Sequence, residues 1–541
     1  MTLPRGLIAA ASIGLLVCLP VVGSAQSQRP ARQQSAASIP QLRAAVKSNP
    51  RNAEMRNALG LALGKSGQLD EAIAEFREAL ILKPDYVQAW TSLGIALEQK
   101  GDLQNATVAF LKAADLSPKD AELHLSLGSI FLRQQNPERA VAELRTAAQL
   151  RPNSAEIHSN LGFVLGQAGD FDGAKAEFEM AIRLNPRLAE AFYYLGTTLL
   201  QRGGENDLAE AIKSLRQAVR LKPQSAEAHT SLGVALRESG ELEESTTTLQ
   251  QAVRLNPKLI EAHNNLGLTF LQRKKPDEAL AEFRAVIRLD PNNVNAHLNS
   301  GLALMQKGDV TGATASYRTL ISIAPQMFEA HYNLALALKG KDDLAGAIEA
   351  LRQCIALRPD FPDAHFTLGE IYLQQAKFDE ALTSLSEAVR LNPNDGEAHY
   401  RLGSVWQRKG ETEAAITEFR TAIRLAPGSP EIHNALGAAL RQKGEAEAAR
   451  AELQEATRLS KLKNDLQAAA TTTQSGIQLL SEGKIAAAIE RFEAAIKLAP
   501  DYAEAHYQMS IALRKKGQAA AAQEAFRKAQ QLDPKIRRRA R

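Results

Sequence analysis

Apolar residues recur along the chain in short runs with helical spacing, and the runs come in pairs. In residues 87–118, Leu93 and Leu97 lie one helical turn apart in the first run, and a second run begins after Gly101. This spacing places each set on one face of a helix. Gly101 suits the left-handed residue that ends a helix, and Pro118 cannot continue one. The pattern therefore predicts a hairpin of two helices that ends at Pro118.

This pair of runs repeats with a step of 34 residues, which indicates stacked copies of one unit. We count fourteen copies between Ala53 and about Lys535. All ten histidines fall on one repeat position once two short insertions are allowed for: His124, His158, His229, His263, His297, His331, His365, His399, His433 and His506. Copies one repeat apart are too distant to share a metal ion at about 2 Å, so we expect these side chains to serve helix packing. We expect neither a metal nor a cofactor.

Other repeat positions are filled as regularly. A Leu-Gly pair marks the first helix, a small residue opens the second, and proline closes the unit, as in Gly94, Ala106 and Pro118. This pattern resembles the tetratricopeptide repeat (TPR). The resemblance implies an all-α, right-handed superhelical solenoid whose first helices line a concave groove. It also implies a protein that binds other proteins or peptides rather than one that catalyses a reaction.

The repeats divide the chain. We expect a signal peptide at 1–25, a disordered linker at 26–38, a half-repeat cap at 39–52, twelve repeats at 53–463, two further repeats at 469–535, and a basic tail at 535–541. Neither proline nor glycine occurs from Glu445 to Gln474, and the proline expected at Lys461 is missing. We therefore predict a continuous helix through the junction at 464–468, with a changed superhelical angle there.

The N-terminus predicts export. Arg5 precedes an apolar run, and Gly23-Ser24-Ala25 fits a cleavage site after Ala25. The alternative is an uncleaved membrane anchor, for which the run is short. We expect a periplasmic location and no membrane span after cleavage.

Charge and cysteine content exclude some classes. The net charge of +4 comes mainly from the tail, since its five basic residues are Lys535, Arg537, Arg538, Arg539 and Arg541. The body is nearly neutral, which argues against nucleic-acid binding. The tail is expected to be a solubilising end, with weak contact to an anionic surface as the alternative. Export would leave Cys354 as the one cysteine, and its repeat position predicts a buried small residue.

Candidate binding residues lie one and two positions after the histidines. Asn265, Asn299 and Asn333 follow one another in successive repeats, and Asn160 is an isolated fourth. They resemble the asparagine ladder of the superhelical part of protein O-GlcNAc transferase, where amides hold a peptide backbone. Successive aromatic residues, expected to be exposed anchors, precede this position: Tyr332, Phe366 and Tyr400. The lysine of the family's carboxylate clamp is mostly replaced by glutamate, so that mode is not carried over.

Glutamate recurs two residues before the histidine position, as in Glu122 and Glu431. A place in the first turn suits the helix dipole, and the alternative is an acidic stripe for a basic partner. The sequence thus favours a non-catalytic, exported TPR scaffold that binds a protein or an extended peptide in its groove. The alternative is a periplasmic adaptor in polysaccharide export or outer-membrane assembly. An enzyme is disfavoured, because no segment outside the repeats is long enough for a catalytic domain.

Overall fold

The computed structural model describes residues 38–204, 206–534 and 536, and within these residues the regular structure is entirely α-helical. The predicted signal peptide, nearly all of the linker and the basic residues of the tail lie outside the described residues. Two compact units divide the chain, the first ending at Ile323 and the second beginning at Ala324. The junction predicted at 464–468 falls inside the second unit.

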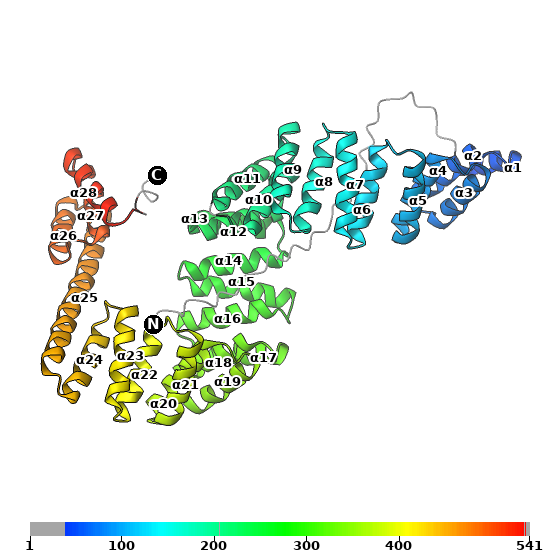
Figure 1. The fold of residues 1–541 in the computed structure, drawn as a ribbon. Helices are drawn as coiled ribbons and strands as arrows, with labels where there is room; N and C mark the ends of the chain where they lie inside the picture. Colours follow the sequence, from blue (N-terminus) through cyan, green and yellow to red (C-terminus); the bar gives the residue numbers. More distant parts are fainter. Residues whose placement is uncertain (1–37, 205, 535, 537–541) are drawn as a thin grey trace. The chain divides into compact units, whose positions relative to one another are not determined.

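The helices follow one another as antiparallel pairs in both units (Figure 1). The first unit contains α1 (Ile39–Ser48), α2 (Ala53–Lys65), α3 (Leu69–Leu82), α4 (Val87–Lys100), α5 (Leu103–Leu116), α6 (Ala121–Arg133), α7 (Pro137–Leu150), α8 (Ala155–Gln167), α9 (Phe171–Leu184), α10 (Ala189–Arg202), α11 (Asp207–Leu221), α12 (Ala226–Ser239), α13 (Leu242–Leu255), α14 (Ile260–Gln272), α15 (Pro276–Leu289), α16 (Val294–Lys307) and α17 (Val310–Ile323). The second contains α18 (Phe328–Gly340), α19 (Leu344–Leu357), α20 (Pro362–Gln374), α21 (Phe378–Leu391), α22 (Gly396–Arg408), α23 (Thr412–Leu425), α24 (Pro430–Lys443), α25 (Ala446–Ser481), α26 (Ile485–Leu498), α27 (Ala503–Lys515) and α28 (Ala519–Leu532).

The pair α4 and α5 shows why the sequence forms a hairpin. Gly101 ends α4 with φ of 86°, a left-handed conformation that favours glycine. Asp102 then caps α5, because its side chain accepts a hydrogen bond from the backbone N–H of Asn105. The predicted hairpin and the role of Gly101 are confirmed.

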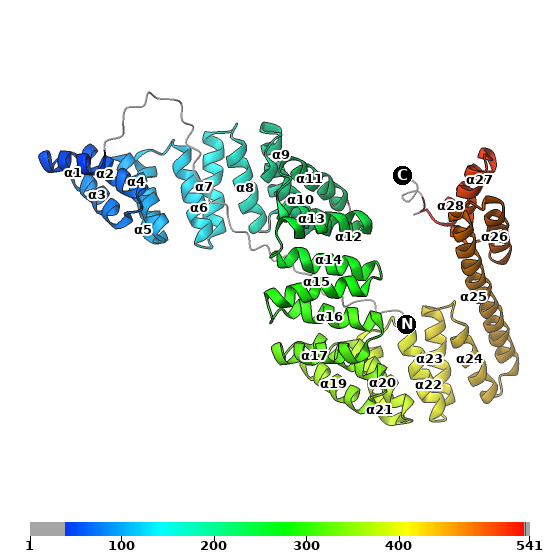
Figure 2. The same ribbon diagram turned by 180° about the vertical axis from the view of Figure 1, so that it is seen from behind.

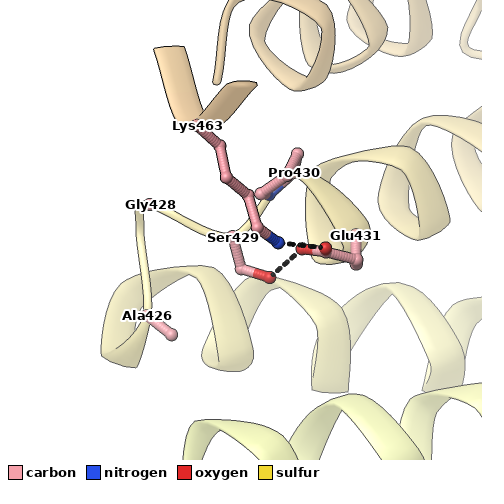
Figure 3. A pocket seen from close by; sticks show the side chains of 6 residues that line it. All are labelled: Ala426, Gly428, Ser429, Pro430, Glu431 and Lys463. Atoms are coloured by element: carbon pink, nitrogen blue, oxygen red, sulfur yellow. Dashed lines mark hydrogen bonds and ion pairs between the residues drawn. The ribbon is translucent and has the colours of Figure 1, made fainter. Parts of the chain in front are cut away.

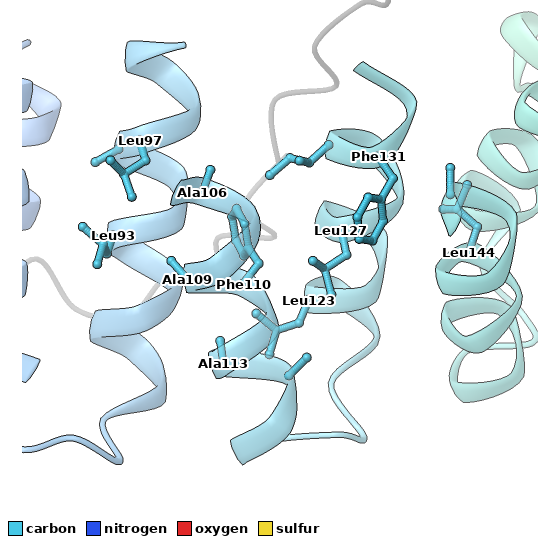
Figure 4. Packing of buried hydrophobic residues seen from close by; sticks show 14 of the residues in the cluster. Leu93, Leu97, Ala106, Ala109, Phe110, Ala113, Leu123, Leu127, Phe131 and Leu144 are labelled. Atoms are coloured by element: carbon cyan, nitrogen blue, oxygen red, sulfur yellow. The ribbon is translucent and has the colours of Figure 1, made fainter. Parts of the chain in front are cut away.

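The two helices of a pair approach closely at the Leu-Gly glycine. A Cβ atom added to Gly94 would lie 2.7 Å from Cε2 of Phe110, so the ring occupies the space a side chain would need. Figure 4 shows Phe110 between α4 and α6, beside Leu127 of the next repeat. Buried residues of this kind join neighbouring hairpins, and burial of their apolar surface is the main source of stability in a repeat array.

Ion pairs add a second link between neighbouring repeats. A cation at the end of one first helix pairs with an acid in the first turn of the preceding second helix: Lys100–Asp70, Arg202–Asp172, Arg273–Glu243, Lys307–Asp277, Lys409–Asp379 and Lys443–Glu413. The acidic partners are well exposed, so each pair contributes about 0–1 kcal/mol.

In the second unit, α25 is a single helix of 36 residues (Figure 2). It packs against α24 with its first part and against α26 with its last part, and so belongs to two hairpins. Residues 464–468 lie within it without interruption, where the sequence places a linking helix. Counting α25 twice, the helices from α2 to α28 form fourteen hairpins, and the all-α solenoid class is confirmed.

Candidate functional site

The six candidate binding residues do not fall in one unit. Asn265 on α14 and Asn299 on α16 belong to the first unit. The other four lie in the second unit on α18, α20 and α22: Asn333, Tyr332, Phe366 and Tyr400. A binding site must therefore be sought within one unit at a time.

The three asparagine side chains are less exposed than side chains that hold a peptide in a groove need to be. Asn265, Asn299 and Asn333 are only 6% to 8% exposed. The amide Nδ2 of Asn265 donates to the carbonyl oxygen of Glu261 at 2.8 Å, and Asn333 donates to its own helix in the same way. Part of the hydrogen-bonding capacity that would hold a peptide backbone is thus used inside the helix.

The expectation that Tyr332 is an exposed anchor is wrong. Its side chain is 3% exposed and packs edge-on against Phe361, with 5.1 Å between ring centroids. This burial raises the pKa of the Tyr332 hydroxyl to about 12. Phe366 and Tyr400 are half-buried, and the Arg401 guanidinium lies over the Tyr400 ring at 5.4 Å.

The histidines have a common structural role. In all ten, Nε2 donates to the carbonyl oxygen of the proline six residues earlier, at 2.8 to 3.2 Å. Trp90 makes the same bond to Pro84 through its indole N–H. The histidine position thus attaches each first helix to the turn that closes the preceding repeat, and the structural interpretation is confirmed. Within the described residues, no group of three or more His, Cys, Asp or Glu side chains could hold a metal ion.

Sequence reasoning missed the acid that completes this arrangement. In five repeats a glutamate nineteen residues after the histidine contacts Nδ1 at 2.5 to 2.7 Å: His124–Glu143, His158–Glu177, His263–Glu282, His399–Glu418 and His433–Glu452. Both ring nitrogens of these histidines then face oxygen atoms. The bond to Glu282 is the main reason that the pKa of His263 is raised. The constant spacing of nineteen residues between each histidine and its glutamate could have revealed these pairs from the sequence.

The glutamates two residues before the histidines lie in the first turn, as predicted. Three glutamates at this repeat position pair with a cation near the end of their own repeat: Glu122–Arg151, Glu190–Lys222 and Glu431–Lys463. Ion pairing of this kind reduces the negative field available to a basic partner.

The Glu431–Lys463 pair lines a cavity of about 390 Å³ in the second unit. Figure 3 shows Lys463 of α25 and Ser429 both pointing at Glu431. Lys463 lowers the pKa of this glutamate. The carboxylate is thus already satisfied by the chain itself, which leaves the cavity without an evident ligand group.

Cys354 is buried, as predicted, and desolvation raises the pKa of its thiol to about 12. Such a thiol stays protonated and is a poor nucleophile.

A cluster of aromatic side chains on α8 and α10 was not predicted. Phe163 lies 5.0 Å from Tyr194 between ring centroids, and Tyr194 lies 5.3 Å from Tyr193. All three rings are only half-buried. Ser231 of α12 lies beside Tyr193 and partly offsets the rise that burial gives the pKa of its hydroxyl, so the cluster adjoins a third successive first helix. We call Phe163, Tyr193 and Tyr194 the aromatic cluster. The three consecutive aromatic residues Phe192-Tyr193-Tyr194, in a chain with only 5% aromatic residues, were the sequence feature that could have revealed it.

Spacing on the first helices places the cluster on the face that carries the candidate asparagines. Asn160 lies one helical turn before Phe163, and no hydrogen bond joins its amide to another described residue. Burial raises the pKa of the Tyr194 hydroxyl to about 12, and that hydroxyl also has no partner among the described residues. The site therefore combines apolar rings with unused donors and acceptors, which are the features of a surface that binds a protein or peptide rather than of a reaction centre.

The geometry defines an all-α helical-repeat protein. Models of the family described as "Tetratricopeptide repeat" or "TPR repeat" match residues 31–86, 264–328, 341–376, 366–430, 407–462 and 479–540, which is more than half of the chain. The protein belongs to the TPR family. Residues 85–295 also match "Cilia and flagella-associated protein 70 C-terminal domain".

Solved structures give partial matches. The TPR protein YrrB, described as having "an unusual peptide-binding site", is 24% identical with a TM-score of 0.32, and the match covers 35% of this chain and 97% of that one. MamA from Desulfovibrio magneticus RS-1 is 28% identical with a TM-score of 0.30, covering 32% and 96%. Cut9–Hcn1 of the APC/C is 16% identical with a TM-score of 0.35, covering 91% and 95%. The comparison with curated proteins finds no match. No described helix has the length and apolar character to cross a membrane.

Proposed function

We propose that this protein is an exported, non-catalytic scaffold that binds an extended segment of a partner protein across the aromatic cluster. The observation that carries the proposal is the chain of ring contacts from Phe163 through Tyr194 to Tyr193, which joins two successive first helices. Export rests on the N-terminal sequence alone.

The chemistry of the cluster suits a peptide. Aromatic side chains provide a large contact area at little cost in conformational entropy, and tyrosine adds a polar group. The free amide of Asn160 can both donate to and accept from a peptide group. Together these groups can hold a backbone and bury an apolar side chain without reading a long sequence.

The test compares two pairs of half-buried aromatics. The double variant Phe163→Ala, Tyr194→Ala alters the cluster, and Phe366→Ala, Tyr400→Ala alters the residues predicted from sequence in the second unit. Each mature full-length protein is used to capture partners from envelope extract, and the captured proteins are quantified by mass spectrometry. Far-ultraviolet circular dichroism checks that helicity is unchanged.

We expect the first variant to lose partners that the native protein and the second variant retain. Loss in the second variant alone would assign binding to the second unit and contradict the proposed site. Retention by both variants would exclude these aromatics as the binding surface.

A further inference from the structure

We propose that Arg237 binds a carboxylate of the segment that lies across the aromatic cluster. This inference rests on the proposed function and adds the chemistry of the partner, namely an acidic side chain or a free C-terminus. Arg237 lies on α12, six residues after Ser231 and about 9 Å further along the helix.

Arg237 is enclosed but has no hydrogen-bonded partner. Its side chain is 11% exposed, and its Nε is fully buried with no acceptor. The nearest carboxylate is that of Glu238, at 4.0 Å, and no other ion pair joins Arg237 to the described residues. A guanidinium keeps its charge at neutral pH and carries five N–H donors, so most of its bonding capacity is unused.

Comparison with a later repeat shows what is missing. In the second unit, Lys339 holds the position equivalent to Arg237, and its Nζ contacts Glu370 of the next repeat at 2.9 Å. In the repeat that follows Arg237, the position equivalent to Glu370 holds the buried Leu268. The first unit thus keeps the cation of this pair but replaces its acid with an aliphatic side chain.

A largely enclosed cation whose ion pair is as long as 4.0 Å is poorly compensated, and an anion that reaches it is bound correspondingly well. Carboxylates suit guanidinium best among peptide groups, because two parallel N–H···O bonds can form. The arginines near the ends of the neighbouring first helices are paired, Arg202 with Asp207 at 2.6 Å and Arg273 with Glu243. Arg237 has no comparably close acid among the described residues.

The experiment uses three pools of nonapeptides, each passed over immobilised mature full-length protein. All pools are N-acetylated, with uncharged residues at the eight outer positions. The first has a central Glu and a C-terminal amide, the second a central Gln and an amide, and the third a central Gln and a free C-terminal carboxylate. Retention is quantified by mass spectrometry for each pool.

Three variants accompany the native protein. Arg237→Met removes the charge and keeps the side-chain length. Leu268→Glu leaves Arg237 in place and supplies an internal carboxylate that competes with the ligand. Arg441→Met, at the equivalent and exposed position of α24, is the matched control.

We expect the native protein and Arg441→Met to retain one acidic pool about tenfold more strongly than the neutral pool, as for a hydrogen bond to a charged group. Preference for the first pool identifies a side-chain carboxylate, and preference for the third a C-terminus. Both Arg237→Met and Leu268→Glu should abolish the preference. Equal retention of all pools by the native protein, or a preference that survives in both variants, would overturn the role of Arg237 while peptide binding stands. Retention of no pool would instead overturn the proposed function itself.

Discussion

The contact between His263 and Glu282 makes a prediction about pH. In Glu282→Gln the carboxylate that faces Nδ1 becomes an uncharged amide of nearly the same shape. The bond from Nε2 to the Pro257 carbonyl remains, so only the charged half of the arrangement is tested. His263 is 9% exposed on its side chain and Glu282 is 21% exposed, which leaves the pair only partly screened by water.

The sign of the effect follows from the direction of the shift. Glu282 raises the pKa of His263 above its ordinary value of 6.5, although burial and Arg288 oppose it. The stability that the pair contributes is therefore fully present below pH 6.5 and is lost as the pH rises through the higher pKa of the folded protein. A hydrogen bond between charged groups contributes about 1.5–3 kcal/mol, so we expect Glu282→Gln to destabilise its hairpin by roughly that amount at pH 5.5. At pH 9 the neutral ring can accept a bond from the new amide, and the loss should vanish.

The assay is amide hydrogen exchange of α14 and α15, followed by mass spectrometry, with variant and native protein compared at the same pH. A local readout is needed because repeat arrays open in parts. The control is His331→Gln, since Ala350 stands at the position of the glutamate in that repeat and only the bond to Pro325 can be lost. Equal destabilisation by Glu282→Gln at pH 5.5 and pH 9 would refute the reasoning.

Three other predictions concern packing and the chain ends. Gly94→Val should destabilise its hairpin by about 1–3 kcal/mol, because the added Cβ would lie 2.7 Å from the Phe110 ring. Gly64→Val is the control, because its Cβ would meet only Ala72 at 3.9 Å and the loss of stability should be smaller. Urea denaturation measures both variants, and equal losses would contradict the prediction. The mature protein should begin at Gln26, and an intact Met1 in its mass spectrum would exclude cleavage. Deletion of 535–541 should leave salt-sensitive binding to vesicles containing anionic lipid unchanged, as expected for a solubilising end; reduced binding would favour the alternative contact with an anionic surface.

The regular part of the fold could be predicted from the sequence because it depends on local rules. Helical spacing, the left-handed Gly101 and the closing prolines each act within a few residues, and the 34-residue period repeats them. The structural role of the histidines also followed, since copies one repeat apart cannot converge on a metal. The continuous helix α25 passes through the stretch from Glu445 to Gln474, where the sequence lacks both proline and glycine.

The candidate site could not be predicted in the same way, because exposure depends on which side chains neighbouring repeats contribute. Tyr332 resembles an exposed anchor on its own helix, but Phe361 at the end of the same repeat covers it. Arg237 resembles an ordinary charged surface residue, but its side chain is enclosed and has no hydrogen-bonded partner. The boundary between the two compact units at Ile323 could not be predicted either, because the repeat pattern continues across it without a break.

A physical reason connects these successes and failures. Repeat positions that hold the same residue in most copies are used for packing within and between repeats. The histidine is hydrogen-bonded to the preceding turn, and the space beside the Leu-Gly glycine is filled by an aromatic ring. Such positions have little capacity left for a partner. At positions that vary among the copies no single stacking contact is required, so a copy that departs from its neighbours can be used for binding. The position of Arg237 holds Leu200 in the preceding repeat and Leu271 in the following one, and Phe192 replaces the histidine beside the aromatic cluster. In a chain of repeats, the residues that depart from the repeat on its first helices are therefore where binding is best sought.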